Sequence, residues 1–374
     1  MTGEIRSLAD VEAFRPEPDG RFHSATHAEI AAGATADIYF IKTLEILRRM
    51  HLEDTPVVGE VFAQRAGLLC GIDEVLQLLR GRAVDVEALA EGERFAGREV
   101  VVRLRGPYAA FGPYETAILG MLASASAWAT AAADLRQAAG ELPLICFGSR
   151  HLHPAVAPVM ERAALVGGMD GASNILAARL SGGDPSGTLP HAVMLIVGDT
   201  VEVAKVYDQA MPPGEARTVL VDTFHDEAEE ALRVAAALGP RLSAVRLDTP
   251  FERGGVTPEL VREVRARLDQ AGARHVGIVV SGRVTPERIP LLAAAGAAAF
   301  GVGSYVSAAP PIDMTLDLKE VAGAPIAKRG RIPGVTETPR LRLRLQGGRL
   351  PGGAMGGRRR GKPAPQEHPQ EVRR

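Results

Sequence analysis

The pattern of hydrophobic and polar positions changes near residue 140 of this 374-residue chain. Before that point, an alternating β-branched segment at 99–106 is followed by a long alanine-rich segment at 114–139. The alternation predicts a half-buried strand. Gly112-Pro113 before the second segment and Gly140 after it predict the two ends of a helix. We therefore expect a first domain that mixes strands and helices.

From residue 141 to about 330, short continuous apolar runs alternate with amphipathic runs. Continuous apolar strands that alternate with helices are typical of parallel sheets buried on both faces. Two weaker strand signals fall near 168–174 and 187–190. The five clear runs lie at 144–148, 218–224, 242–249, 275–282 and 298–304. This number of repeats predicts an α/β barrel of seven or eight strands, with an open parallel sheet as the alternative.

The composition divides the chain into five segments. They are an N-terminal extension at 1–22, an α/β domain at 23–140 with a helical dimer-forming segment, a barrel at 141–330, a segment at 331–346 that returns to the first domain, and a tail at 347–374. The returning segment contains an alternating run, "RLRLRL", which predicts one more strand. The tail is rich in Gly, Pro and basic residues, so it buries too little apolar surface to order itself. We expect it to be disordered and solvated.

The overall charge and the two cysteines narrow the class of protein. A net charge of −2, with 24% charged residues, gives no indication of a nucleic-acid or membrane-surface partner. The N-terminus lacks the apolar segment of a secretory signal, and no apolar run approaches the length of a membrane span. Cys70 and Cys146 lie in apolar surroundings, which predicts buried thiols in a reducing compartment. We expect a cytoplasmic protein.

Charged and small residues gather where the predicted strands end, which is where parallel barrels carry their chemistry. These residues are Phe147, Arg150, Thr188, His191, Asp222, Arg246, Asp248, Ser281, Gly282, Gly301 and Gly303. Glycine loops after late strands suit a phosphate, and arginine forks suit phosphate or carboxylate. The aspartates suit a water-bridged Mg²⁺ or sugar hydroxyls. Each residue alone also fits a cap, a turn, a surface ion pair or core packing, but together they predict a pocket for a phosphorylated sugar and an anionic aromatic ring.

Eight motifs, in this order and spacing, resemble those of nicotinate phosphoribosyltransferases, which have the type II phosphoribosyltransferase fold. The resemblance runs from about His23 to Arg331. The motifs are "SATHAEIAAGATADIYF", "CFGSRHLHPAVAP", "GTLPHA", "VDTFHDE", "RLDT", "VVSGRV", "GVGSYV" and "DLKEVAGAPIAKRGR". The resemblance implies an irregular seven-stranded TIM-like barrel with an N-terminal α/β sandwich domain, assembled as a homodimer. It implies that nicotinate and phosphoribosyl pyrophosphate give nicotinate mononucleotide and pyrophosphate, with ATP hydrolysis coupled to the step and Mg²⁺ on the pyrophosphate.

The resemblance also implies roles for residues at the base. Asp37 and Tyr39 match a "D-x-Y" motif, whose tyrosine stacks on the pyridine ring, often across the dimer. Phe147 matches the stacking partner on the other face of the ring. Arg150 matches an arginine near the pyridine and the ribose phosphate. Thr188 falls within "GTLPHA", and we expect it to bind substrate.

Further roles follow for the nucleotide and the phosphates. His191 matches the histidine that ATP phosphorylates, and Asp222 matches a carboxylate near that histidine and the ribose. From the residues alone, His191 is equally well a packed or capping histidine. Arg246 and Asp248 match an "R-x-D" motif at the substrate. The expected phosphate-binding positions are Ser281, Gly282, Gly301 and Gly303. No metal site made of protein ligands alone is expected.

Two departures leave the base open. Thr249-Pro250 follows Asp248 where the family often continues "S-G-D", so the next acidic ligand is missing, and "SRHLHP" is shorter than the family's usual form. Quinolinate is a second candidate base, although its two carboxylates would need more arginines at the pocket. Nicotinamide is a third and would need an acceptor for its amide. A catalytically silent member that binds phosphoribosyl ligands or a partner protein is a further alternative.

Overall fold

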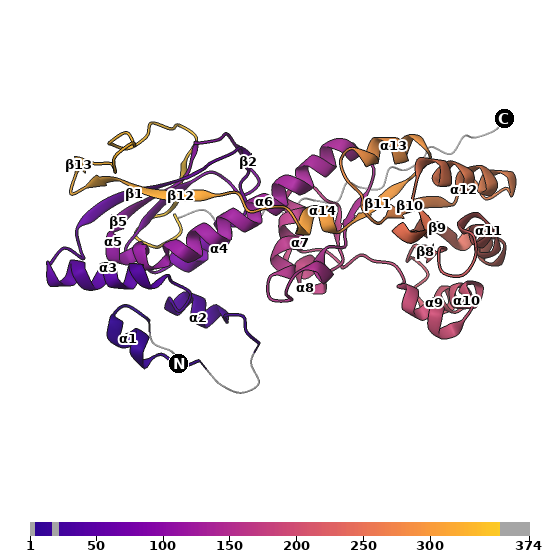
Figure 1. Cartoon of the computed structure of the whole chain (residues 1–374), viewed down its shortest axis with the longest axis horizontal. Coiled ribbons are helices and arrows are strands. Elements are labelled where there is room, and N and C mark those ends of the chain that lie inside the picture. Colours follow the sequence, from indigo (N-terminus) through magenta and orange to yellow (C-terminus); the bar gives the residue numbers. More distant parts are fainter. Residues whose placement is uncertain (1–3, 17–21, 352–374) are drawn as a thin grey trace, which may run out of the picture.

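The computed structural model describes residues 4–16 and 22–351. Two six-stranded sheets lie at opposite ends of the molecule, and helix α6 (Glu115–Ala139) runs from one to the other (Figure 1). The predicted α/β class and the two-domain plan are confirmed. Most of the predicted basic tail, from residue 352, falls outside the described residues.

The N-terminal sheet is antiparallel and has the strand order β13-β12-β1-β5-β3-β14. Its strands are β1 (Pro56–Ala63), β3 (Asp85–Ala88), β5 (Val100–Pro107), β12 (Met314–Val321), β13 (Ala324–Pro325) and β14 (Arg342–Leu345). A two-stranded ribbon, β2 (Gly67–Leu68) and β4 (Arg94–Phe95), stands beside it. The strand expected in the returning segment is present as β14. The chain already returns to this sheet at β12, which is earlier than the predicted boundary at 331.

Short helices complete the N-terminal domain. They are α1 (Leu8–Ala13), α2 (His27–Ala32), α3 (Ile38–Arg49), α4 (Ile72–Leu79), α5 (Tyr108–Phe111) and the 3₁₀ turn η1 (Gly112–Tyr114). Thr26 and Glu29 form a capping box at the start of α2, which ends at Gly33 with a left-handed φ of 87°. Asp37 then sits at the N-cap of α3. The "D-x-Y" motif therefore lies at the start of a helix in this domain.

The C-terminal sheet is entirely parallel, in the order β7-β6-β11-β10-β9-β8. Its strands are β6 (Leu144–Cys146), β7 (Gly171–Ala172), β8 (Arg217–Leu220), β9 (Leu242–Leu247), β10 (Gly277–Ser281) and β11 (Ala299–Val302). No strand forms at 187–190 within the described chain, so the sheet is a six-stranded half-barrel rather than a seven-stranded closed one. Gly187 and Pro190 explain the difference, since glycine weakens a strand and proline has no N–H for a ladder.

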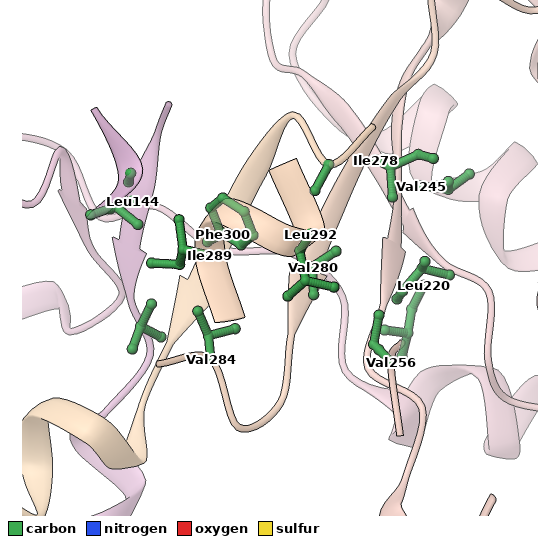
Figure 2. Close-up of a cluster of buried hydrophobic side chains, with 14 of the residues drawn as sticks. Leu144, Leu220, Val245, Val256, Ile278, Val280, Val284, Ile289, Leu292 and Phe300 are labelled. Atoms are coloured by element: carbon green, nitrogen blue, oxygen red, sulfur yellow. The ribbon is translucent and has the colours of Figure 1, made fainter. Parts of the chain in front are cut away.

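Helices surround this half-barrel. They are α7 (Ala157–Val166), α8 (Ile175–Leu180), α9 (His191–Val197), α10 (Thr200–Ala210), α11 (Glu227–Leu238), α12 (Pro258–Gln270), α13 (Arg288–Ala294) and α14 (Ser304–Ser307), with 3₁₀ turns η2 (Ser149–His151), η3 (Gly239–Arg241) and η4 (Phe251–Arg253). Figure 2 shows how buried side chains such as Val245, Ile278 and Phe300 fill the space between strands and helices. Burial of each such side chain stabilises the fold by about 1.5–3 kcal/mol.

Helix α6 belongs to both cores. Its first half places Ile118 and Leu122 in the core of the N-terminal domain, and its second half places Ala129 and Leu135 in the core of the half-barrel. Its many alanines allow close packing, since a Cβ built on Gly167 would lie 2.3 Å from the Ala129 carbonyl oxygen. The stretch 108–139 has the length and hydropathy of a membrane span, and half of its most apolar window is buried inside the protein. That burial fits a core helix.

Both cysteines are free and buried, as predicted. Burial raises the pKa of the Cys146 thiol to about 12 and also raises that of Cys70. Neither thiol is therefore a reactive nucleophile near neutral pH.

Candidate active site

We call the carboxyl ends of the six parallel strands, with the loops that follow them, the rim. Arg246, at the end of β9, stands at the centre of its best-connected network. Its Nε donates to Ser281 Oγ (2.9 Å), its Nη1 to Thr188 Oγ1 (2.7 Å) and its Nη2 to Asp248 Oδ2 (3.0 Å). Ser281 Oγ in turn donates to Asp248 Oδ1 (2.9 Å). Four of the predicted site residues, from three segments, thus form one hydrogen-bonded group.

Thr188 lies in this network although its segment forms no strand. The Arg246 guanidinium holds the 187–190 segment against the mouth of the half-barrel, on the side where β7 and β8 do not pair. A charge-assisted bond of 2.7 Å is among the stronger polar contacts that a protein makes. The segment is therefore fixed by a side chain where a strand ladder is missing.

Phe147 adds an aromatic face to the same region. The Arg246 guanidinium carbon lies 5.2 Å from the centre of the Phe147 ring. The ring also lies against Gly301 of β11, because a Cβ built there would be 2.2 Å from Phe147 Cε2. Gly301 is therefore a position where only glycine leaves room for the ring, and this role differs from the phosphate contact predicted for it.

His191 and Asp222 form a second pair on the rim. His191, the first residue of α9, places Nε2 3.0 Å from Asp222 Oδ2, just after β8. The Asp222 side chain is fully buried, whereas the His191 side chain is 39% exposed. Burial raises the pKa of Asp222, which the bond to His191 partly offsets and the Asp248 charge reinforces. Because an ionised carboxylate only accepts, Nε2 donates and Nδ1 is left with its lone pair.

The remaining glycine positions lie in the loops after β10 and β11. Gly282 has a left-handed φ of 81° and is followed by Arg283 at 51°. A Cβ on Gly282 would lie 3.1 Å from Asp248 Oδ1, and one on Gly303 would lie 2.9 Å from His151 Cε1. The loop after β10 thus approaches the Arg246 network, and the loop after β11 approaches the turn after β6.

Arg150 lies in the η2 turn after β6, three residues from Phe147, and is exposed. Within the described residues it makes no hydrogen bond or ion pair. The backbone on both sides of it is held in place, since Ser149 bonds to Glu161 and His151 Nδ1 lies 2.9 Å from Ser307 Oγ. Arg150 therefore offers a free guanidinium on a fixed turn.

Asp37 and Tyr39 are not brought to this rim. They lie at the start of α3 in the other domain, away from β8, β9 and β10 (Figure 1). Thr116 Oγ1 donates to Asp37 Oδ2 (2.9 Å) and accepts from the Asp37 N–H (3.1 Å). The Tyr39 residue is 56% exposed. Within a single chain, the two predicted halves of the base site stay apart.

Two residues near the predicted site were missed by the sequence reasoning. Glu161 on α7 is fully buried and binds both the η2 turn and the loop after β7. It lies between Met160 and Ala164 on the buried face of α7. A carboxylate among apolar positions of a helix was therefore the sequence signal that could have identified it. Thr116 gave no such signal, because nothing in the sequence links it to Asp37, 79 residues away.

The rim offers little of its own to a metal ion. No group of three His, Cys, Asp or Glu residues suited to a metal occurs in the part of the chain that the structure describes. Both Asp248 oxygens are engaged by Arg246 and Ser281. Asp222 Oδ1 is buried and has no hydrogen-bond partner. One free carboxylate oxygen suits a Mg²⁺ that is held mainly by phosphate oxygens and water.

Comparisons with known proteins agree with this fold. Residues 37–126 match the family described as "Quinolinate phosphoribosyl transferase, N-terminal domain", and residues 128–317 match its C-terminal domain. The nicotinate phosphoribosyltransferase pncB1 of Mycobacterium tuberculosis (strain H37Rv) is 36% identical over 343 residues, which cover 80% of this chain and 75% of that protein.

Solved structures of related proteins share this fold. The crystal structure of a nicotinate-nucleotide pyrophosphorylase from Pyrococcus furiosus is similar at a TM-score of 0.84 and 40% identity, covering 88% of this chain and 93% of that one. Human nicotinic acid phosphoribosyltransferase is similar at a TM-score of 0.68 and 20% identity, over 84% and 89%, which concerns the fold alone. The names of these relatives divide between two activities.

Proposed function

We propose that nicotinate is the base on which this chain acts. The chain belongs to the type II phosphoribosyltransferases, with their quinolinate-phosphoribosyltransferase N- and C-terminal domains, and it transfers phosphoribosyl groups to pyridine bases in NAD biosynthesis. The products are then nicotinate mononucleotide and pyrophosphate. ATP is the proposed co-substrate, and the proposed assembly is a homodimer.

The observation that supports nicotinate is which of the rim arginines already contact other side chains. Arg246 has all three of its nitrogens engaged by Ser281, Thr188 and Asp248. Arg283 stacks on Phe251, 4.4 Å from the ring centre. Three residues after Phe147, Arg150 keeps its guanidinium free within the described chain. Arg283 keeps its N–H donors but stacks on the Phe251 ring, so of these three arginines Arg150 alone neither bonds nor stacks within the described chain. One such guanidinium matches one carboxylate, which favours nicotinate over a dicarboxylate base.

Quinolinate is the second candidate, and one comparison favours it. The Pyrococcus furiosus protein, whose title calls it a nicotinate-nucleotide pyrophosphorylase, is 40% identical to this chain over 88% of its length. Transfer to quinolinate would release CO₂ in addition to pyrophosphate, because the carboxylate next to the ring nitrogen leaves and a proton takes its place when nicotinate mononucleotide forms. The two activities therefore differ in a product that is easily measured.

In the proposed reaction the pyridine nitrogen forms a bond to ribose C1 as the C1–O bond to pyrophosphate breaks. Positive charge grows on the ribose ring in the transition state. Asp222 and Asp248 supply negative charge to this region, and Arg150 orients the base through its carboxylate. Mg²⁺ bound to the pyrophosphate would neutralise the leaving group, with Asp222 Oδ1 as the available protein oxygen. No covalent help is required of the chain in this step.

His191 is the proposed phosphate acceptor from ATP. Nε2 donates to Asp222, so the Nδ1 lone pair of the partly exposed imidazole is available to attack the γ-phosphorus of ATP, with ADP as the leaving group. Asp222 stabilises the positive charge that the ring gains, in the way that a carboxylate orients a catalytic histidine. Hydrolysis of the phosphorylated imidazole would then complete ATP turnover.

The homodimer would join the two halves of the base site. Tyr39 and its neighbours Ile38, Ile46 and Met50 on α3 are exposed, at 56, 44, 57 and 59%. The half-barrel also exposes apolar side chains on α8 and α9, namely Ile175, Leu176, Leu180, Leu195 and Ile196. Apolar surfaces of this kind are typical of interfaces between subunits. In such a dimer, Tyr39 would stack on a base held at the partner's rim.

A pyrophosphate-release assay tests the proposal, with nicotinate, quinolinate and nicotinamide compared in parallel and CO₂ measured for quinolinate. We expect turnover with nicotinate and stimulation by ATP. His191→Gln keeps an N–H for Asp222 but removes the phosphate acceptor, so it should lose the ATP stimulation and the label from γ-³²P-ATP. Turnover with quinolinate alone would replace the proposed base, and binding of phosphoribosyl pyrophosphate without turnover would indicate a silent member.

A further inference from the structure

Glu161 is a buried carboxylate that forms hydrogen bonds but no ion pair within the described chain. It lies on α7 and is 0% exposed, on the face that also buries Met160 and Ala164. No Lys, Arg or His forms an ion pair with it among residues 4–16 and 22–351. Burial of a charge without a counter-ion costs several kcal/mol unless hydrogen bonds compensate for it. The donors around Glu161 therefore determine whether this position is tolerated.

Four donors surround this carboxylate, and they come from two different rim loops. Oε1 accepts from Ser149 N (3.1 Å), Ser149 Oγ (2.8 Å) and Ser173 Oγ (3.0 Å), and Oε2 accepts from Asn174 N (2.7 Å). Asn174 Nδ2 closes the group by donating to Ser149 Oγ (3.1 Å). One carboxylate thus connects the turn after β6 to the loop after β7, where the strands themselves have ended.

We propose that Glu161 is a positioning residue for base binding, which fixes the turn that presents Arg150. The inference rests on the proposed role of Arg150 at the base. Ser149, directly before Arg150, gives two of its groups to Glu161. Gly148 packs against Met160, since a Cβ there would lie 2.6 Å from Met160 Cε. The backbone of the turn is fixed while the Arg150 guanidinium remains free, which is the arrangement that lowers the entropy cost of binding an anion.

The substitution Glu161→Gln tests this role in the full-length protein. The amide is close in size to the carboxylate, but its NH₂ group must face one of the donors, most directly the Asn174 N–H. We expect the KM for nicotinate to rise on the order of tenfold, with kcat changed much less and the KM for phosphoribosyl pyrophosphate unchanged. In an Arg150→Ala background the same substitution should add little, because Glu161 acts through Arg150.

Two further variants separate positioning from general stability. Glu60→Gln removes a carboxylate that is 1% exposed in β1, where it pairs with Arg103 at 2.7 Å. It should lower the melting temperature and leave the KM for nicotinate unchanged. Ser173→Ala keeps the Glu161 charge and removes one donor, so it remains informative if Glu161→Gln does not fold. We expect it to raise the KM for nicotinate about two- to threefold.

Amide hydrogen exchange gives a readout that needs no substrate. In Glu161→Gln, exchange in peptides that contain Ser149 and Asn174 should be faster than in the wild type. Unchanged exchange, or an equal rise in the KM of both substrates, would contradict the role of Glu161. A wild-type chain that is inactive with nicotinate would contradict the proposed base alone, because the exchange result stands independently of activity.

Discussion

The two domains hold their predicted substrate-binding residues in opposite ways. In the half-barrel, Arg246 bonds to three partners within 3.0 Å, and each belongs to a different segment of the rim. In the N-terminal domain, the Asp37 carboxylate is bound by Thr116, and Tyr39 is largely exposed. The rim residues are held by hydrogen bonds to one another, whereas the "D-x-Y" motif presents its ring outward. The proposed homodimer would account for this difference, because a second subunit would cover the exposed ring.

Removal of Arg246 should have the largest effect. Arg246→Ala takes three donors from the rim and leaves Asp248 without its counter-ion. We expect kcat/KM to fall by about 10²–10³, as measured by initial rates of pyrophosphate release. Arg246→Lys is the matched variant, and it should recover little because one ammonium group cannot reach three separate acceptors. A loss smaller than tenfold would mean that the network is structural rather than functional.

Tyr39→Ala should have the next largest effect and also tests the dimer. We expect the KM for nicotinate to rise about 10- to 30-fold through loss of ring stacking. An equal mixture of Tyr39→Ala and Arg246→Ala chains, unfolded and refolded together, should regain about a quarter of wild-type activity. Random pairing gives half of the dimers one chain of each variant. Each mixed dimer has one site in which Tyr39 and Arg246 are both present and one site in which both are replaced. No recovery on mixing would place both residues in one chain's site and remove the contrast between the domains.

Gly301→Ala should have a moderate effect on the rim alone. The new Cβ would lie 2.2 Å from the Phe147 ring, so the ring has to move. We expect a loss of about 1–3 kcal/mol of unfolding free energy from overpacking, together with a higher KM for the base. Denaturant unfolding and initial rates measure the two effects. Gly120→Ala, on α6 with no atom within 4 Å of the added Cβ, is the control and should show neither.

The sequence allowed the rim to be predicted because the carboxyl ends of parallel strands meet at one edge. Arg246, Asp248 and Ser281 were placed there from strand patterns alone, and the structure brings them within hydrogen-bonding distance. The roles of these residues in catalysis remain predictions. The pairing of Thr188 with Arg246 was not predictable, because it depends on a segment that forms no strand.

Other features depend on tertiary contacts that leave no periodic signal. The apolar pattern near 187–190 suggested a seventh strand, but backbone hydrogen bonding is interrupted there by Pro190. The run 314–321 reads as an ordinary continuation of the barrel, and only its pairing with β1 shows that it belongs to the other sheet. The four bonds to Glu161 join parts of the chain that are 12 or 13 residues apart, through side-chain geometry that periodicity does not encode.

The smallest expected effect concerns Glu115, at the first turn of α6 in the N-terminal domain. Burial, and then the Asp317 charge, raise its pKa to about 7, while Lys328 opposes them. Burial, then the Asp37 charge and the Glu115 charge, raise the pKa of Tyr39, so Glu115 lies near the "D-x-Y" motif. Because the pKa is higher in the folded state, stability falls as the pH rises from about 4.5 to 7, and the full cost persists above pH 7.

Glu115→Gln removes the free-energy cost of a buried, ionised carboxylate. It should therefore raise the melting temperature at pH 8.5 by a few degrees and have a smaller effect at pH 5. Thermal unfolding of both proteins at the two pH values measures the difference. Glu141→Gln, at an exposed position after α6, is the control and should show no such dependence. If a second subunit covers this surface, burial of Glu115 increases on association. The stabilisation by Glu115→Gln at pH 8.5 should then grow with protein concentration, and a gain that is independent of concentration would argue against coverage of this half of the site.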